Sequence, residues 1–481
     1  MSRATGLLAA TDLREEADSD LGDPRRTERL KSLTAALGAA PSASYPSVFN
    51  SSELEAYYRF VRNDQIVFDD ILQAHRDNTI ARARTVGSVL LIHDTTEFNF
   101  PLRDEVLRDG LCRFSSKRQG FLAHASLVVS SDGPSAPLGV LGFRPFAHTK
   151  QLANKKAVRF WDTQFGAMDS EYDRWLEAVS ETDGALDGID DIIHLMDREA
   201  DSYELLASML EQDHRFIVRL GQDRNTSDPD TEEIVSIKEA LISQPVLARR
   251  RVELSARTGS DRRTLSSRKK HPARGKRAAK LEFRARTVRV NKPKRPKKDL
   301  SHLPASIEIN VVEALETNPP EGEEPVRWIL ATTEPISEVN AALQVVDHYR
   351  SRWLIEEYFK AIKTGCAYTK RQLESVHTLL LALAIDIPIA WHLLVMRHLS
   401  RHADNLPASV AVSPAQLAIL KAAVKKWKWS ENPTVREVTL AIARLGGHLK
   451  SNGEPGWQTL GRGYQSLLVM EVGWRAAMEA Q

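Results

Sequence analysis

An α/β fold with a mixed sheet, flanked by helical segments at both ends, is the class that this sequence predicts. Three observations support it. Helical patterns fill the chain to about residue 75 and again from about 375, short β-rich apolar runs alternate with helical patterns between them, and residues 221–327 form an irregular stretch. At roughly 100–200 residues per domain, the 481 residues predict about two to four structural units.

The composition is that of a globular protein. Apolar residues make up 42% of the chain and aromatic residues 7%, which excludes wholesale disorder. Cys112 and Cys366 show no paired spacing, which argues against a disulfide framework or a thiolate zinc site and favours a reducing cytoplasm. The longest apolar run, 379–396, is interrupted by polar residues and Pro388. We therefore expect a buried helix kinked near this proline, and no membrane partner.

The N-terminal segment is expected to be helical. Asp23 followed by Pro24 is a good cap and first-turn pair for one helix. Ser52 and Glu55 have the spacing of a capping box for a second helix. The exposed end of the first helix would carry three arginines, which form either a binding surface or only a solvated face: Arg25, Arg26 and Arg29.

Strands are expected from residue 87 onward. Two short apolar runs each end in a carboxylate, which is Asp94 after 87–93 and Asp197 after 189–196. The remaining elements of the predicted core are a hairpin around Asp132 and Gly133, a helix at 202–212, and strands at 214–220 and 326–335. This order of strands and helices predicts a mixed sheet.

The irregular stretch is strongly basic. Residues 249–298 carry 21 lysines and arginines against three acidic residues, although the net charge of the chain is only +2. This local excess predicts a polyanionic partner, and the alternative is a flexible, solvated loop. Two β-like pieces, at 280–290 and 306–315, indicate a β-rich insertion in the core.

A charged stripe marks residues 349–363, which read as one amphipathic helix. A wheel of 100° per residue gathers four side chains on one face, with Lys360 at its border: Tyr349, Arg352, Glu356 and Lys363. Glu357 falls on another side, so the pattern selects Glu356. The stripe is either a set of ion pairs facing solvent or a metal-binding carboxylate beside phosphate-binding groups.

Three carboxylates from separate elements favour a metal site over a set of ion pairs facing solvent. Asp94 and Asp197 follow predicted strands, where an aspartate alone is often only a turn or cap residue. Together with Glu356 they offer the hard oxygen ligands that Mg²⁺ prefers. Two such ions can activate the attacking oxygen and stabilise the leaving oxygen in phosphoryl transfer. The set therefore predicts nuclease-type chemistry.

These motifs together resemble a known family. The Y-x2-R-x3-E-x6-K pattern from Tyr349 to Lys363, "DREAD" at 197–201 and "DTT" at 94–96 are similar to motifs of the cut-and-paste bacterial transposases of the insertion-sequence-four family. Four further stretches look familial: "LGDPRRTERL" at 21–30, "AYYRFVRN" at 56–63, "WLIEEYFKAIKTG" at 353–365 and "AIARLGG" at 441–447. The similarity covers nearly the whole chain.

The resemblance implies a ribonuclease H-like catalytic core, with an Asp-Asp-Glu triad and a β-rich insertion before the glutamate. It divides the chain into a helical DNA-binding domain at 1–75, a catalytic domain at 76–375 with its insertion at about 221–325, and a helical dimerisation domain at 376–481. The stretch between Arg219 and Trp328 is longer and more basic than the family pattern, so a role there in holding DNA is inferred from charge alone.

The resemblance also implies roles for individual residues. Asp94, Asp197 and Glu356 would be catalytic and bind two Mg²⁺ ions, with Mn²⁺ as a substitute. Trp328 would stack on a flipped base, although a tryptophan at a strand start can equally be a core residue. The other implied DNA-binding residues are Tyr349, Arg352, Lys363, Lys360 and Arg219 near the cleaved end, and Arg25, Arg26 and Arg29 in the end-binding segment.

The predicted function is cut-and-paste transposition of DNA at the nucleoid in a bacterial cytoplasm. Hydrolysis would nick the transposon end, and the freed 3′-hydroxyl would attack the opposite strand to give a hairpin, which is reopened before attack on target DNA. The partners would be double-stranded transposon ends, target DNA and a second copy in a homodimer. The alternatives are a structure-selective nuclease on the same fold and an inactive DNA-binding relative that acts as an inhibitor.

Overall fold

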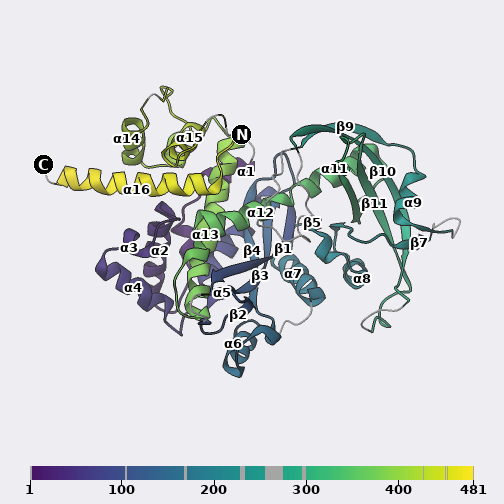
Figure 1. Cartoon of the computed structure of the whole chain (residues 1–481), viewed down its shortest axis with the longest axis horizontal. Coiled ribbons are helices and arrows are strands. Elements are labelled where there is room, and N and C mark those ends of the chain that lie inside the picture. The colour runs from purple at the N-terminus through teal and green to yellow at the C-terminus, as the bar shows by residue number, and fades with distance from the viewer. Residues whose placement is uncertain are drawn as a thin grey trace. The chain divides into compact units, whose positions relative to one another are not determined.

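The computed structural model describes residues 3–102, 106–166, 171–227, 233–254, 275–294, 299–425, 427–449, 451 and 453–479. The chain forms two compact units (Figure 1). Unit 1 contains Met1–Ile192 and Trp353–Gln481, and unit 2 contains Ile193–Arg352. Unit 2 is thus inserted in chain order between the two parts of unit 1. The predicted division at residues 75 and 375 follows other boundaries and stays a prediction.

Unit 1 begins with helices. These are α1 (Arg3–Ala9), the 3₁₀ turn η1 (Glu15–Ala17), α2 (Pro24–Ala39), α3 (Tyr45–Val48), α4 (Ser51–Val61) and α5 (Phe68–Val86). Asp23 caps α2 as predicted, because its carboxylate accepts the Arg25 N–H at 2.8 Å. The predicted cap of α4 is wrong. Asn50 and Glu53 form the capping box, each accepting the backbone N–H of the other at 3.0 Å, so α4 begins at Ser51.

An antiparallel group of strands follows in unit 1. It consists of β1 (Ser88–Pro101), β2 (Cys112–Ser115), β3 (Arg118–Ser130) and β4 (Pro137–Phe146), with β3 paired to the other three. The hairpin around Asp132 and Gly133 is confirmed, and Gly133 supplies the positive φ of 60° that its turn requires. The expected end of β1 at Asp94 is wrong. The strand continues to Pro101 because Phe98 and Phe100 are buried as it pairs with β3.

Helices cover the remainder of unit 1. They are α6 (Lys155–Phe165), α7 (Glu171–Ala185), α12 (Trp353–Lys360), α13 (Val376–His402), α14 (Pro414–Ala423), α15 (Val435–Leu445) and α16 (Trp457–Glu479), with 3₁₀ turns η2 (Thr149–Gln151), η5 (Tyr368–Lys370) and η6 (Ala408–Val410). Helix α13 packs against α2, α5, α15 and β4. Among the described helices it alone is long and apolar enough to cross a membrane. The expected burial is confirmed, since 94% of its most apolar window is buried.

Asp386 lies within α13 and is 1% exposed. Burial raises the pKa of its carboxyl to about 7, although the charge of Arg371 opposes this shift. Because an unfolded aspartate titrates near 4, the folded state keeps a proton that the unfolded chain loses, and stability falls as pH rises from about 4 to 7. We expect Asp386→Asn to raise the free energy of unfolding by roughly 1–3 kcal/mol more at pH 8 than at pH 5. Urea unfolding at both pH values tests this, and an equal effect at both would contradict it.

The prediction of one helix over 349–363 is wrong. Helix α11 (Val339–Arg350) ends inside this segment. The next two N–H groups donate to carbonyls three residues back, from Ser351 to His348 and from Arg352 to Tyr349. Helix α12 then passes into the π-helical turn η4 (Ala361–Gly365), closed by the Cys366 N–H on the Ala361 carbonyl at 2.8 Å. A single helical wheel therefore does not apply to the segment. The expected apolar face is confirmed, since Ile355, Tyr358, Phe359 and Ile362 are all buried.

Unit 2 contains a mixed sheet, in the order β5-β6-β12-β11-β10-β7-β8 with β9 also on β10. Its strands are β5 (Asp191–Met196), β6 (Phe216–Arg219), β7 (Asn225–Ser227), β8 (Ile234–Ser236), β9 (Ala248–Leu254), β10 (Arg277–Asn291), β11 (Ser306–Thr317) and β12 (Arg327–Thr332). Strands β5 and β6 are parallel, and the other strand pairs in the described part of unit 2 are antiparallel. Its helices are α8 (Tyr203–Glu211), α9 (Ile237–Ile242), α11 and the 3₁₀ turn η3 (Arg198–Ala200). The strands and helix predicted in this region are confirmed.

The basic stretch 249–298 is only partly described, because residues 255–274 and 295–298 lie outside the described ranges. In the described part, several arginines contact carboxylates of unit 2. The pairs are Arg249 with Glu282 at 3.0 Å, Arg250 with Asp347 at 2.7 Å, Arg277 with Glu316 at 2.9 Å and Arg284 with Glu282 at 2.8 Å. Part of the positive charge is therefore neutralised within the fold.

Candidate active site

Asp94 lies within β1, on unit 1. Four buried residues, Val89–Ile92, precede it and hold the strand in the core, and Asp94 stands opposite Ala125 of β3. The side chain is 7% exposed, and its Oδ1 accepts the Thr95 N–H at 2.8 Å. Asp94 is therefore a buried carboxylate on a rigid strand, and not the strand-end residue that the sequence predicts.

Lys363 brings a cation to the same part of unit 1. Its ammonium donates to the Thr96 hydroxyl at 2.6 Å and lies 5.4 Å from the centre of the Phe98 ring. Burial lowers the pKa of Lys363, while the charges of Glu97, Glu356 and Asp94 act in the opposite direction. The charges of Asp94 on β1 and Glu356 on α12 thus both act on the Lys363 ammonium.

Glu356 and its neighbour Glu357 differ in their surroundings. Glu356 is half-buried on α12 and contributes to the field around Lys363. Glu357 accepts hydrogen bonds from Lys360 at 2.8 Å and Trp457 Nε1 at 3.0 Å, and forms a close ion pair with Arg397. Burial would raise the pKa of Glu357, but these partners lower it. Glu357 therefore ties α12 to α13 and α16.

Lys360 is one of the partners of Glu357. It is exposed, pairs with Glu357, and its ammonium lies 4.6 Å from the centre of the Trp353 ring. The Trp353 side chain is itself 56% exposed. Lys360 is thus partly engaged on the surface of α12, and its role in DNA binding stays a prediction.

Asp197 directly follows β5, as predicted, and caps η3. Its Oδ1 accepts the Glu199 N–H at 2.7 Å. The last residue of the same "DREAD" motif, Asp201, accepts the N–H groups of Gly221 and Gln222 at 2.6 and 2.9 Å and forms an ion pair with Arg224. Asp201 therefore fixes the loop that follows β6, a structural role that the sequence did not reveal.

Four predicted DNA-binding residues gather in unit 2: Arg219, Trp328, Tyr349 and Arg352. The Trp328 and Tyr349 rings meet edge to face with centroids 5.4 Å apart, and the Arg219 guanidinium lies 6.0 Å from the centre of the Trp328 ring. Burial lowers the pKa of Arg219, while its hydrogen-bond partner Tyr349 acts in the opposite direction. Burial raises the pKa of Tyr349, against the charges of Arg352 and Arg219 and together with that of Asp197.

The arginines of the N-terminal segment do not all face solvent as expected. Arg25 and Arg29 are exposed one turn apart on α2. Arg26 is half-buried, because its guanidinium donates to the Gln65 side chain and to the Leu21 carbonyl. Arg25 and Arg29 are therefore available to a ligand, whereas Arg26 also holds α2 to the chain before α5.

Eight of the twelve predicted site residues thus form two groups, each within its own unit. Unit 1 brings Asp94, Glu356 and Lys363 together, and unit 2 brings together Asp197, Arg219, Trp328, Tyr349 and Arg352. The sequence did not single out Thr96 and Glu97, which also act on Lys363. Their place two and three residues after Asp94 on a continuing strand was the signal that could have found them.

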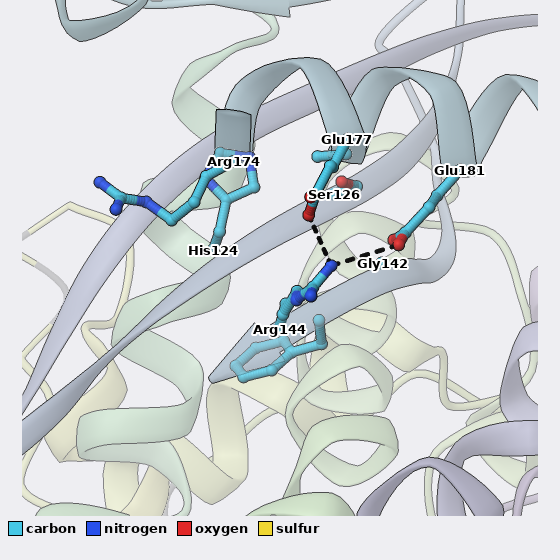
Figure 2. A pocket seen from close by; sticks show the side chains of 9 residues that line it. His124, Ser126, Gly142, Arg144, Arg174, Glu177 and Glu181 are labelled. Atoms are coloured by element: carbon cyan, nitrogen blue, oxygen red, sulfur yellow. Dashed lines mark hydrogen bonds and ion pairs between the residues drawn. The ribbon is translucent and has the colours of Figure 1, made fainter. Parts of the chain in front are cut away.

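A separate small cavity lies between β3, β4 and α7 of unit 1 (Figure 2). Arg144 points to two glutamates there, Glu177 at 2.7 Å and Glu181 at 3.4 Å. Burial and the charge of Arg174 lower the pKa of His124, on the cavity wall, to about 3. Because the two arginines that line it, Arg144 and Arg174, are matched by two carboxylates, this cavity offers a phosphate little net attraction.

The residues fit a hard divalent cation. Asp94 and Glu356 are oxygen donors whose charges already act on one cationic group, the Lys363 ammonium. A catalytic Mg²⁺ or Mn²⁺ ion is usually bound by one or two carboxylates, here from different elements of the fold. Such a donor set suits phosphoryl transfer, and tyrosine and arginine side chains such as those of unit 2 suit the binding of a phosphate.

Two family matches indicate the class of the protein. Residues 13–66 match the family model described as transposase DNA-binding, and residues 173–385 match the model described as transposase DDE domain. The matches support a DNA transposase of the DDE class, which is a metal-dependent enzyme that cleaves and joins DNA. Asp197 and Glu356 lie within the DDE match, while Asp94 lies between the two matched segments.

Proposed function

We propose that the protein is a cut-and-paste transposase of the insertion-sequence-four family and is similar to the Tn-five transposase. The observation that carries the proposal is the hydrogen bond from Lys363 to Thr96 at 2.6 Å, beside the packing of α12, which carries Glu356, against β1, which carries Asp94, in a chain with DNA-binding and DDE matches. We also propose a ribonuclease H-like core, a homodimer that holds two transposon ends, and action in the cytoplasm of a bacterium.

Asp94, Asp197 and Glu356 are the proposed ligands of two Mg²⁺ ions. Bound Mg²⁺ supplies Lewis acidity and lowers the pKa of an attacking water or hydroxyl group. Arg219, Arg352 and Lys363 bind phosphate oxygens beside the cleaved bond, and the hydroxyl of Tyr349 adds a donor. Water then breaks the strand at the transposon end, and the released 3′-hydroxyl attacks the opposite strand, which closes a hairpin and releases the flanking DNA. A second water reopens the hairpin, and the 3′-hydroxyl that this frees attacks the target DNA and displaces a 3′-hydroxyl of the target strand.

The test uses the full chain with DNA carrying the inverted repeats that flank its own gene. In Mg²⁺ or Mn²⁺, the proposal expects nicked ends, then hairpins, then ends joined to a target plasmid. Cleavage without hairpins or joining would favour a structure-selective nuclease on the same fold. Binding without any cleavage would favour an inactive relative that acts as an inhibitor.

Trp328 allows the hairpin step to be tested separately. Its ring is half-buried beside Tyr349 and Arg219, and we propose that an extruded base stacks on it. Base stacking on an aromatic ring contributes about 1–3 kcal/mol, and we expect Trp328→Ala to slow hairpin formation by roughly 5–150-fold while nicking is retained. Trp328→Phe should recover most of the rate. Equal loss of nicking and hairpin formation would instead indicate a purely structural tryptophan.

A further inference from the structure

A second basic surface lies in unit 1, apart from the arginines of α2 and the basic stretch of unit 2. Residues 106–118 and 148–163 contain eight lysines and arginines against two aspartates. Seven of these cations are exposed, and we name them the α6-hairpin surface: Arg113, Lys117, Arg118, Lys150, Lys155, Lys156 and Arg159. None of the proposed site residues belongs to it.

Three contacts bring the two segments together. Trp161 of α6 donates its indole N–H to the Gly110 carbonyl at 2.9 Å, and its ring lies 6.0 Å from that of Phe121 on β3. Lys156 forms an ion pair with Asp109 at 3.2 Å. Helix α6 is thus fixed beside the chain that enters β2, as Figure 1 also shows. The cations of α6 and of the β2–β3 hairpin therefore form one surface on a rigid support.

The charges at the start of α6 are unfavourable for the helix itself. Lys155 and Lys156 occupy its first turn, which has no acidic residue and where the helix dipole repels cations. Lys155 and Arg159 are one turn apart, which adds repulsion between like charges. The buried face of α6, through Ala157, Trp161 and Phe165, needs none of these cations. A phosphate near this helix start would relieve the repulsion.

The surface continues from the candidate active site. Strand β1 carries Asp94 and ends at Pro101, which stands opposite Arg118 on β3. At about 3.4 Å per residue, this part of the strand spans about 24 Å, close to the length of seven base pairs of duplex DNA. Arg118 pairs at 3.2 Å with Glu97, whose charge acts on Lys363. A DNA backbone crossing the carboxylates could therefore follow the same strand to α6.

We propose that the α6-hairpin surface binds the phosphate backbone of duplex DNA that runs past the catalytic carboxylates. This inference rests on the proposed function and adds a second DNA contact to it. Since target DNA and the DNA flanking the transposon present the same phosphates, the chemistry alone does not separate these two sources. The surface contacts phosphates and not bases, so its binding is independent of sequence and strongly dependent on salt.

The test is the full-length double variant Lys155→Glu, Arg159→Glu, which keeps the ion pair between Lys156 and Asp109. Acidic residues favour the first turn of a helix, so Lys155→Glu should leave the thermal midpoint unchanged or higher. The matched control is Lys421→Glu with Lys425→Glu, on and just after α14, which lies away from α6 in unit 1 (Figure 1). Binding is measured without metal against a non-transposon duplex, a transposon end, and the same end with flanking DNA, at several salt concentrations.

The double variant should bind at least one duplex about tenfold more weakly than the unaltered protein, with a salt slope lower by about 2. Loss with the non-transposon duplex identifies target DNA as the ligand, and loss only when flanking DNA is present identifies the flank. Unchanged affinity and slope with all three duplexes would overturn the inference, as would an equal loss in the control. If the unaltered protein never cleaves DNA, the proposed function fails, but this comparison still decides the surface.

Discussion

Glu356→Gln is expected to reduce cleavage of a transposon end by at least about 10³-fold while DNA binding is retained. The substitution keeps the shape of the side chain and removes the charge of Glu356, which acts on Lys363 together with the charges of Glu97 and Asp94. Stabilisation of a transferring phosphoryl group by a metal site is worth several kcal/mol, and about 4 kcal/mol corresponds to 10³-fold. Cleavage of a labelled end and a gel-shift measurement separate the two effects.

Calorimetric titration with Mn²⁺ gives a second measurement that does not depend on activity. We expect Glu356→Gln to weaken Mn²⁺ binding to the protein, since a neutral amide replaces a charged oxygen donor. Manganese is suitable because it accepts the same oxygen ligands as Mg²⁺. Unchanged Mn²⁺ affinity together with unchanged cleavage would remove Glu356 from the proposed ligand set.

Glu357→Gln is the matched control. It changes the same chemical group one residue along α12, but there the carboxylate holds Lys360, Arg397 and Trp457. Its loss leaves the half-buried Arg397 without an anionic partner, so we expect lower stability and at most about a tenfold loss of cleavage. The reverse pattern, with Glu357→Gln inactive and Glu356→Gln active, would show that the assignment of the two glutamates is wrong.

The sequence predicted local features well where neighbouring residues decide them. Asp197 was placed after a strand because an apolar run ends at Met196, and the structure agrees. The cap at Asp23 is likewise set by residues that follow it directly. Asp94 was misplaced because the residues after it look polar, while Phe98 and Phe100 continue the strand by packing into the core. That packing depends on partners distant in the chain, such as Tyr368.

The segment 349–363 shows the same dependence on partners distant in the chain. A regular wheel selected Glu356 over Glu357, and the contacts of Glu357 agree with that choice. The wheel also placed Lys363 by assuming an unbroken α-helix, which η4 interrupts. The π-helical turn ends at Gly365, where an added Cβ would lie 3.0 Å from Leu393 and 3.6 Å from Trp457. Close packing against α13 and α16 therefore accompanies the irregular turn, and no short sequence pattern contains that information.

Arg82→Met is expected to lower the free energy of unfolding by about 3–5 kcal/mol, the usual effect of removing one partner from a buried ion pair. Glu16 is 2% exposed and accepts two hydrogen bonds from Arg82, at 2.6 and 3.3 Å. The guanidinium also donates to the Leu138 carbonyl and lies 4.3 Å from the centre of the Trp391 ring. The exposed Arg84, on the same helix, gives the control Arg84→Ala, which should change stability by less than about 0.5 kcal/mol.

The same network predicts how stability depends on pH. Burial lowers the pKa of His75, whose Nε2 accepts the Val140 N–H at 3.1 Å and whose Nδ1 contacts Glu16. Burial would raise the pKa of Glu16, but His75 and Arg82 lower it. Both folded pKa values lie below those of the unfolded chain, so on acidification the unfolded state binds protons first. Stability therefore decreases as pH falls through about 6.5 for His75 and then through about 4 for Glu16.

Urea unfolding between pH 5 and pH 8 tests this dependence. The variant His75→Gln should show a smaller decrease near pH 6.5, while burial of His124, His392 and His398, which lowers their pKa values, maintains the rest. The network also has a functional consequence, because Glu16 lies in the segment that matches a transposase DNA-binding model and Arg82 and His75 lie on α5. Arg82→Met should therefore weaken binding of transposon ends at temperatures where the rest of unit 1 is still folded. If end binding and global unfolding instead changed at the same temperature, the network would stabilise unit 1 as a whole and would not specifically hold the DNA-binding segment in place.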